Sequence, residues 1–220
     1  MNEKSDPLIN EDPRSRKNSE TDGTRTFSSC ALSNTQTSRF ITITSAYHFE
    51  YKSLNDKSVK TGYDVGVIRS TRPISHTCNL FYFVIKVLNK GIKGAIRIGL
   101  VSERSSMDSM LGWENFTIGY HGDDGKLYHG KGRQCRYGPI FTTDDVIGCG
   151  VDMKNRVIFF TKNGAALGIA STNLPDKTWF PTIGLCSSNE KVKVNFGQEK
   201  FLFNKASYRY TGKNDHFEYF

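Results

Sequence analysis

The stretch FFTKNGAALGIA, residues 159–170, carries the clearest local structural signal in the sequence. Asn163 and Gly164 stand between two runs of strand-forming residues, and both residue types accept the positive φ angles of a type I′ turn. The stretch therefore predicts a β-hairpin with a two-residue turn, in which a strand ending at Lys162 pairs with a strand beginning at Ala165.

Similar short runs, rich in Val, Ile, Phe, Tyr and Thr, recur from Phe40 onward and are separated by turn residues, as is typical of β-strands. In KVKVNF, residues 191–196, apolar side chains alternate with lysines, which predicts a strand with one buried and one solvated face. No segment keeps a helical period over three turns. We therefore expect an all-β fold, an antiparallel β-sandwich. The other expected strands are FITIT (40–44), YDVGVI (63–68), LFYFVIKVL (80–88), AIRIGLVS (95–102), VIGCGVDM (146–153) and RVIFFTK (156–162).

The sequence divides into three parts by composition. Residues 1–38 are polar and show no strand or helix period, so we expect a disordered N-terminal tail. The sandwich is expected to cover residues 39–203, and residues 204–220 form a C-terminal extension. With 220 residues, 37% of them hydrophobic, the chain can build one sizeable core. Neither a secretory h-region nor a run of about 18 apolar residues occurs, so no membrane span is expected.

The five cysteines are scattered and form no CxxC pair, which favours free thiols in a reducing compartment. We therefore expect a cytoplasmic protein, with the nucleus as a further location. Residues 1–39 hold equal numbers of basic and acidic residues, so the net charge of +8 belongs to residues 40–220. A basic folded domain is compatible with an acidic protein partner, with nucleic acid, or with a dispersed charged surface. Nucleic-acid binding is the less favoured of these, because no recognition helix or aromatic RNA-binding pattern accompanies the charge.

The glycine-rich stretch GYHGDDG, residues 119–125, has two interpretations. His121, Asp123 and His129 could hold a divalent metal in a hydrolase. The favoured interpretation is an Asp-Gly turn between two strands. No Walker loop, dinucleotide fingerprint, calcium loop or G-x-S-x-G elbow is present. We therefore expect no enzyme activity, no catalytic residue, no cofactor and no bound metal.

A series of motifs, in this order and spacing, resembles SPRY domains, in particular those of RanBPM-like proteins. The resemblance covers roughly residues 39–203 and implies a bent β-sandwich. The motifs are STRPI (70–74), LFYFVIKV (80–87), LGWENFTIGYHGDDG (111–125), YGPIFTTDDVIGCGVD (137–152), FFTKNGAALGIA (159–170), FPTIGL (180–185) and VNFGQ (194–198).

The resemblance implies a non-catalytic protein-interaction module, or adaptor, that binds a short peptide or a protein loop. In RanBPM-like proteins the domain belongs to a scaffold subunit of a CTLH/GID-type E3 ubiquitin ligase, so the scaffold subunits of such a complex are implied partners. The LisH, CTLH and CRA helical segments of those relatives lie outside the stretch that this chain shares with them.

Related SPRY domains hold their ligand across several loops of one rim, and three loops match here. Arg72 could pair with an acidic ligand group while Pro73 stiffens its loop, although a solvated surface arginine is the alternative. Trp113 matches an aromatic that contacts peptide in related domains, and core packing is its alternative. The third loop is polar where some subfamilies carry a tryptophan. The predicted partner-binding residues are Thr71, Arg72, Pro73, Trp113, Ser187, Ser188 and Asn189.

Overall fold

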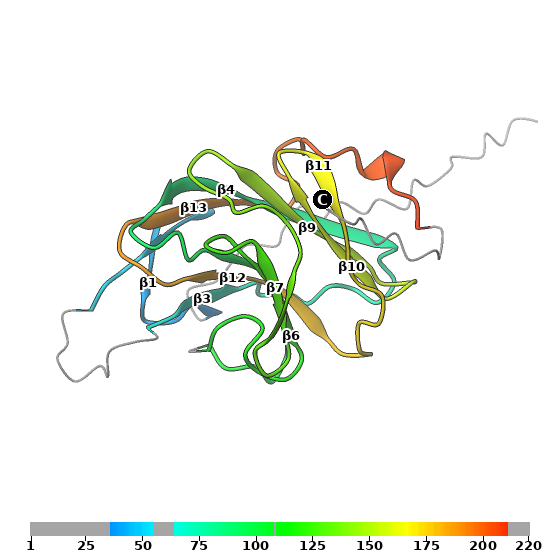
Figure 1. Ribbon diagram of the computed structural model, residues 1–220, viewed down its shortest axis with the longest axis horizontal. Coiled ribbons are helices and arrows are strands. Elements are labelled where there is room, and N and C mark those ends of the chain that lie inside the picture. Colours follow the sequence, from blue (N-terminus) through cyan, green and yellow to red (C-terminus); the bar gives the residue numbers. More distant parts are fainter. Residues whose placement is uncertain (1–35, 55–63, 108, 211–220) are drawn as a thin grey trace, which may run out of the picture.

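A computed structural model describes residues 36–54, 64–107 and 109–210 of the chain. Two antiparallel β-sheets face each other and form a sandwich (Figure 1). The strand orders are β1-β2-β13-β4-β9-β10-β11 in the seven-stranded sheet and β3-β12-β5-β6-β7-β8 in the six-stranded sheet. The predicted all-β class and the antiparallel sandwich are therefore confirmed.

Each of the seven expected strands is present, with ends that differ from the predicted runs by at most three residues, whereas β2, β8 and β12 were not among the expected strands. The seven-stranded sheet contains β1 (Ile41–Ser45), β2 (His48–Tyr51), β4 (Leu80–Lys90), β9 (Val146–Asp152), β10 (Val157–Lys162), β11 (Ala165–Ser171) and β13 (Glu190–Asn195). The six-stranded sheet contains β3 (Gly66–Arg69), β5 (Arg97–Ser102), β6 (Thr117–His121), β7 (Lys126–His129), β8 (Arg133–Arg136) and β12 (Trp179–Leu185). A short 3₁₀ turn, η2 (Lys205–Ser207), follows the last strand. Within the described ranges, no helix has the length and apolar character needed to cross a membrane.

The predicted hairpin forms between β10 and β11. Its central residues Asn163 and Gly164 have φ angles of 52° and 85°, as a type I′ turn requires. Lys162 pairs with Ala165 directly before and after the turn. The Asn163 side chain also accepts a hydrogen bond from the backbone N–H of Val146 at 2.8 Å. This hydrogen bond connects the turn to the beginning of β9, in addition to the pairing within the hairpin.

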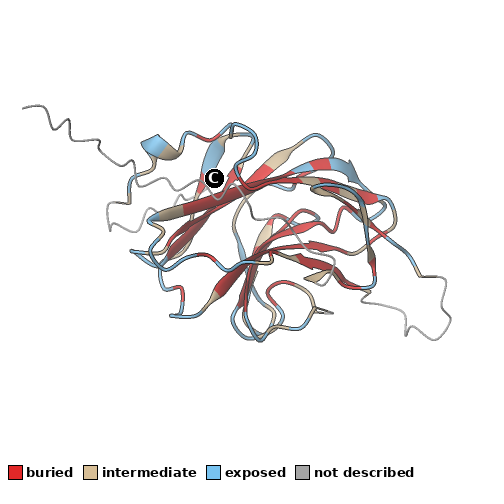
Figure 2. Cartoon of the chain, turned by 180° about the vertical axis from the view of Figure 1, so that it is seen from behind, coloured by how far each residue is buried: buried red, intermediate tan, exposed pale blue. Residues whose placement is uncertain are grey.

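The main core lies between the two sheets, where Figure 2 shows the buried residues in red. The predicted alternation of β13 is confirmed, because Val192 and Val194 are buried and the alternating Lys191 and Lys193 are partly exposed. The same alternation in β4 sends Phe81 and Phe83 into the core and turns Tyr82 to the opposite face. This period of two is what allows one sheet to bury both of its faces.

The C-terminal segment covers the part of the outer face of the seven-stranded sheet around Tyr82 and Phe159. Phe203 packs on Tyr82 and Phe159 with ring-centroid distances of 5.2 and 5.6 Å, and Tyr208 stacks on Phe159 at 4.8 Å. The expected boundary at residue 203 is therefore too early, since Tyr208 belongs to the packed domain. Residues 211–220 of the predicted extension lie outside the described residues.

The domain also begins slightly before the predicted boundary at residue 39. Ser38 is buried, its backbone N–H donates to the Val67 carbonyl at 2.9 Å, and its hydroxyl donates to the Val65 carbonyl at 3.2 Å. Thr37 forms a β-bridge with Ile68. These contacts bring the last residues of the expected tail into the fold beside β3. Residues 1–35, for which disorder was predicted, lie outside the described residues.

The hairpin turn provides a stability test. Gly164→Val should lower the free energy of unfolding by about 2 kcal/mol or more, because a β-branched residue resists a positive φ. In addition, a Cβ at this position would lie 3.1 Å from the Leu202 Cβ. Urea denaturation followed by fluorescence measures the change.

Ala165→Val is the matched control for this substitution. Ala165 is exposed at the first position of β11, where an extended backbone suits valine. Its stability should stay within about 0.5 kcal/mol of the parent chain. Equal stability of the two variants would contradict the assigned turn.

Candidate functional site

The stretch GYHGDDG forms the end of β6 and the turn into β7, as the favoured interpretation predicted. The Gly125 N–H donates to the His121 carbonyl at 3.1 Å, and Gly125 has a φ of 68°. Asp124 closes the turn, because its Oδ1 accepts from the Lys126 N–H at 3.0 Å and its Oδ2 accepts from the Tyr128 hydroxyl at 2.8 Å. The Asp124 carboxylate is thus occupied by a backbone N–H and by the hydroxyl of a neighbouring tyrosine.

The proposed metal set of His121, Asp123 and His129 is not brought together. His129 is exposed and pairs with Ile118, three residues along β6 from His121, which corresponds to roughly 10 Å. Ligand atoms of His121, Asp123 and Asp124 do lie within 4.8 Å of one another. However, both nitrogens of His121 are engaged: Nδ1 accepts from Arg97 Nε at 3.2 Å and Nε2 donates to the Leu111 carbonyl at 3.0 Å. The lone pair that a metal needs is therefore used by Arg97.

Strand β12 defines the two ends of the sandwich. In Figure 1 it runs from the right side of the molecule, in gold, toward the left, in brown. Its first residue, Trp179, pairs with Ser102 at the end of β5, and Gly184 pairs with Arg97 at the beginning of β5. We call these two sides the Trp179 end and the Arg97 end. Strand β12, which runs from one end to the other, has seven residues and is roughly 20 Å long.

The three predicted binding loops do not share one end. The loop with Thr71, Arg72 and Pro73 follows β3 at the Trp179 end, where the Ile74 N–H donates to the Trp179 carbonyl at 2.8 Å. Residues 187–189 follow β12 at the Arg97 end. The physical reason is that β3 and β12 are antiparallel neighbours, so that their C-termini point in opposite directions.

Trp113 lies in the loop between β5 and β6 and is 48% exposed, so the alternative of core packing does not hold. Its ring lies beside the turn between β7 and β8, 3.8 Å from where a Cβ of Gly132 would be. Arg72 and Pro73 are also exposed. Contact of these residues with a partner stays a prediction.

A polar cavity of about 330 Å³ opens at the Arg97 end. Lys93 and Arg97 contribute positive charge to its walls, and Asp64 and Asp123 contribute negative charge. Its remaining lining residues are Tyr51, Ala95, Met110 and Cys186. Half of the eight lining residues are charged, and a cavity of this size can hold a small part of a ligand.

Arg97 is the most unusual group in this cavity. It is 4% exposed, and its guanidinium donates to His121, to the Ala95 carbonyl at 2.6 Å and to the Cys186 sulfur. None of the ion pairs among the described residues includes Arg97. A buried guanidinium that forms no ion pair with a carboxylate favours a further acceptor on its cavity side.

Glu190, which sequence analysis missed, organises the Arg97 end. It is fully buried, and its carboxylate accepts from the Ala95 N–H at 2.8 Å, from the Cys186 N–H and from the Ser187 hydroxyl at 2.6 Å. Burial raises the pKa of Glu190. Ser187 also accepts from the Lys93 N–H at 3.0 Å, so the hydroxyl predicted to bind a ligand is used inside the fold. The Ser187 hydroxyl thus holds the cavity wall in position. Asn189, two residues later, is exposed.

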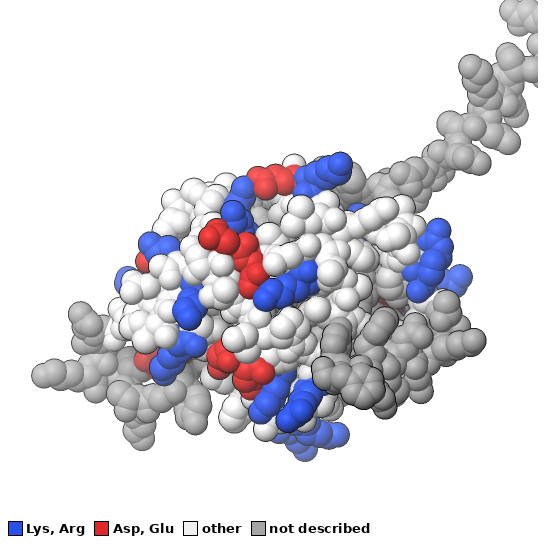
Figure 3. All heavy atoms as spheres, turned by 45° about the horizontal axis from the view of Figure 1, so that its top comes forward, with Lys and Arg blue, Asp and Glu red and all other residues white. Residues whose placement is uncertain are grey.

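The basic surplus of the chain is spread over its surface. On the face shown in Figure 3, Lys and Arg side chains lie among Asp and Glu side chains and form no continuous band. Of the described cysteines, Cys149 is buried, Cys78 and Cys186 are partly buried, and Cys135 is exposed. All four are free thiols, as predicted.

Comparison with known proteins assigns this sandwich to a family. The SPRY domain model of protein families matches residues 80–199, which is more than half of the chain. The chain belongs to the SPRY family. Members of this family generally act as interaction modules and not as catalysts.

The relatives extend the match beyond the family model. The SPRY chain is 44% identical over 149 residues to Ran-binding protein 9 from Xenopus laevis and from Homo sapiens, covering 68% of this chain but 27% and 20% of those proteins. It is 41% identical over 179 residues to the Ran-binding protein M homolog of Arabidopsis thaliana, covering 79% of this chain and 38% of that one. The chain therefore spans less than half the length of these relatives.

Solved SPRY structures share the fold. A human SPRY domain superposes with a TM-score of 0.63 at 30% identity, covering 74% of this chain and 98% of that domain. The SPRY domain of human HERC1 superposes with a TM-score of 0.62 at 20% identity, covering 77% of this chain and 99% of that domain, and shows the fold alone.

His121 gives this end of the SPRY domain a defined pH response. Burial, followed by the charge of Arg97, lowers the pKa of His121 to about 3 from an ordinary 6.5. The unfolded chain therefore takes up a proton below about pH 6.5 that the folded chain refuses until about pH 3. The stability contributed by neutral His121 is complete above pH 6.5 and is lost as the pH falls, by up to about 1.4 kcal/mol per pH unit.

We expect the stability difference between the parent chain and His121→Gln to shrink between pH 7 and pH 4 in urea denaturation. Imidazole ¹⁵N NMR should show the neutral Nε2–H form of His121 at pH 5. An imidazolium at that pH would contradict the assigned hydrogen bonds.

Proposed function

We propose that this SPRY domain is a non-catalytic adaptor that binds a segment of a partner protein in the cavity at the Arg97 end. The observation that carries the proposal is the buried Arg97 guanidinium, which lines the cavity and has no carboxylate partner among the described residues. A backbone carbonyl or an acidic side chain of the partner would complete its hydrogen bonds.

The cavity favours recognition of a specific segment over general attraction. Two cations and two anions balance each other in its walls, and Met110 and Tyr51 add apolar contact. Arg97 is held by three acceptors, so little conformational entropy is lost when a ligand binds. The arrangement supports a short peptide that places one acceptor group at Arg97 and one apolar side chain beside Met110.

The identity of the partner is part of the proposal. The relatives are named for binding Ran, which supports a protein ligand for this chain as well. A scaffold subunit of a CTLH/GID-type ubiquitin ligase is the partner class implied by the RanBPM-like resemblance. A cytoplasmic location, which extends to the nucleus, belongs to the same proposal.

Lining variants test the cavity directly. Affinity purification of the full chain, quantified by mass spectrometry, should recover a defined set of partners. Lys93→Glu and Met110→Glu should each reduce that set by about tenfold, because both place an anion where an acceptor group of the partner would lie. Lys200→Glu, in the exposed segment after β13, makes the same charge change as Lys93→Glu away from the cavity and from Trp113, and should keep the partners.

Thermal unfolding of each variant separates lost binding from lost folding. Lys93 is exposed and Met110 is partly exposed, so melting temperatures should change by no more than a few degrees. Partners recovered equally by Lys93→Glu, Met110→Glu and the parent chain would remove this cavity from the proposal.

Trp113 requires a separate test, because it lies outside the lining of the cavity. As a half-exposed anchor, Trp113 should contribute about 2 kcal/mol or more to the binding of an identified partner, measured by calorimetry on Trp113→Ala. Stability should change little, because a surface side chain leaves no core cavity. Full affinity of Trp113→Ala would limit recognition to the Arg97 end.

A further inference from the structure

A second cavity, of about 200 Å³, lies at the Trp179 end, on the opposite side of the sandwich from Arg97. Three loops meet around it: the loop between β3 and β4, the turn between β9 and β10, and the loop between β11 and β12. We propose that this cavity binds the phosphate group of a phosphorylated serine or threonine in a protein segment. The inference goes beyond the function proposed for the Arg97 end and does not depend on it.

The charge of this cavity is markedly positive. Lys154, Arg156 and Lys177 line it together with His76, and Asp176 is the single acidic residue of the lining. None of these residues takes part in an ion pair within the part of the chain that the structure describes. Three cations and one carboxylate leave a net positive charge around this cavity, which attracts an anion that carries more than one negative charge.

Arg156 is held in position before any ligand arrives. It has a φ of 58°, its Nε donates to the Leu174 carbonyl at 2.7 Å, and its carbonyl accepts from the Leu174 N–H at 3.0 Å. Among the described residues, no acceptor is bound to its terminal nitrogens. A guanidinium fixed at Nε can present those nitrogens to two oxygens of a phosphate.

Hydrogen bonds to Asp152 and from Trp179 hold the two loops that carry the cations. Asp152 accepts from the backbone N–H and the side-chain amide of Asn155, at 2.9 and 2.8 Å, which fixes the turn between β9 and β10. Trp179 donates from Nε1 to the Pro175 carbonyl at 3.0 Å, which fixes the loop before β12. The cavity is therefore preformed, and binding requires little ordering of the backbone.

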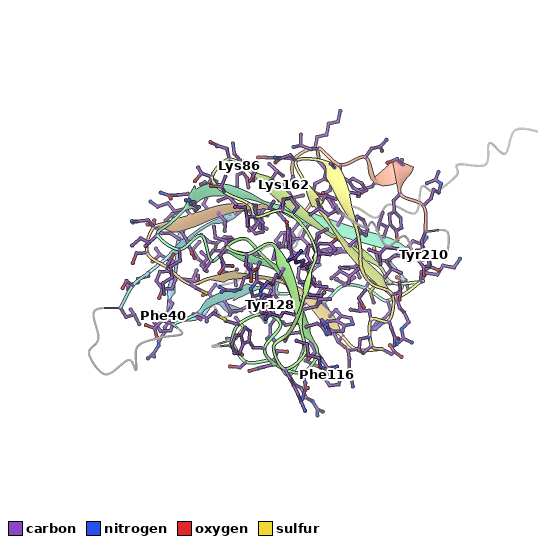
Figure 4. The ribbon with its side chains drawn as sticks, in the orientation of Figure 1. Phe40, Lys86, Phe116, Tyr128, Lys162 and Tyr210 are labelled. Carbon is purple, nitrogen blue, oxygen red and sulfur yellow. The ribbon has the colours of Figure 1, made fainter. Side chains whose placement is uncertain are left out.

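Lys177 is positioned by an aromatic ring. Its amino group lies 4.9 Å from the ring centroid of Phe116, a half-exposed residue that Figure 4 shows at the lower edge of the molecule. A lysine over a ring face keeps its charge and its remaining donors available to a second acceptor. This contact also links the loop between β5 and β6 to the phosphate-sized cavity.

The shape of the site favours a protein ligand over nucleic acid or a membrane surface. A volume of about 200 Å³ holds a phosphate group with a few water molecules, and Met153 and Leu174 provide an apolar wall for the attached chain. Nucleic-acid grooves need a row of cations and exposed rings for stacking, whereas Trp179 is 2% exposed and Phe116 already contacts the amino group of Lys177. Recognition of anionic lipid usually takes a cluster of four or more basic residues.

The test is an amide NMR titration of the full chain with an end-capped pentapeptide that has one central phosphoserine flanked by alanines. We expect saturable shift changes at Lys154, Arg156, Asp176 and Lys177. The double variant Lys154→Gln with Lys177→Gln should bind at least about fivefold more weakly, because two cation–anion contacts are lost. Asp176→Asn should bind more tightly, since it removes the only repulsive charge of the lining.

The controls separate this site from general attraction to a basic protein. Lys200→Gln removes one exposed charge elsewhere and should leave the titration unchanged. The unphosphorylated peptide should give no saturable shifts, and a glutamate peptide should bind more weakly than the phosphoserine peptide. Thermal unfolding of the double variant should match the parent, because Lys154 and Lys177 are both exposed.

Two results would overturn the inference. One is equal affinity of the parent chain and the double variant for the phosphoserine peptide. The other is the absence of peptide binding while phosphatidylserine vesicles or a single-stranded RNA bind in a manner that depends on Lys154 and Lys177. Because the titration uses no partner of the Arg97 end, its outcome is independent of the function proposed for that cavity.

Discussion

Strand β12 pairs with β3 on one side and with β5 on the other, antiparallel in both cases. Neighbouring antiparallel strands end in opposite directions, so the loops after β3 and after β12 diverge by the length of a strand. The same pairing brings residues 91–96 and 186–189 together at one end, and residues 70–79 and 172–178 at the other. Both cavities are consequences of this arrangement.

The cavities at the two ends differ in the burial and in the balance of their charged residues. We therefore expect them to bind different kinds of ligand group. At the Arg97 end a single guanidinium is buried and held by neutral acceptors, within walls of balanced charge. At the Trp179 end the cations are exposed and outnumber the one acidic residue. Salt screens exposed charges much more than buried ones. Binding at the Trp179 end should therefore respond strongly to ionic strength, and binding at the Arg97 end should depend on fit.

Local signals predicted the fold but only part of the site. Asn163-Gly164 and the alternation in β13 act within a few residues, so sequence alone was sufficient for both. Glu190 lies in a polar stretch of sequence that is typical of a surface loop. Its carboxylate can be buried because it accepts a hydrogen bond from the Ala95 N–H, 95 residues away in the sequence. The separation of Arg72 from Ser187 likewise follows from strand pairing, which no local pattern encodes.

Packing on the outer faces of the two sheets supports the proposal that the loops bind the partner. On the seven-stranded sheet, Gly148 and Gly150 leave room for the rings of Tyr82 and Phe159, and Phe203 then covers those rings. On the six-stranded sheet, Leu111 packs across the outer face against Phe180. A sheet face that is already covered by its own chain cannot receive a partner without unpacking aromatic or aliphatic contacts, which costs several kcal/mol. The exposed charged residues at the strand ends, such as Lys93 and Lys154, carry no such penalty, because they can be exchanged without loss of core contacts.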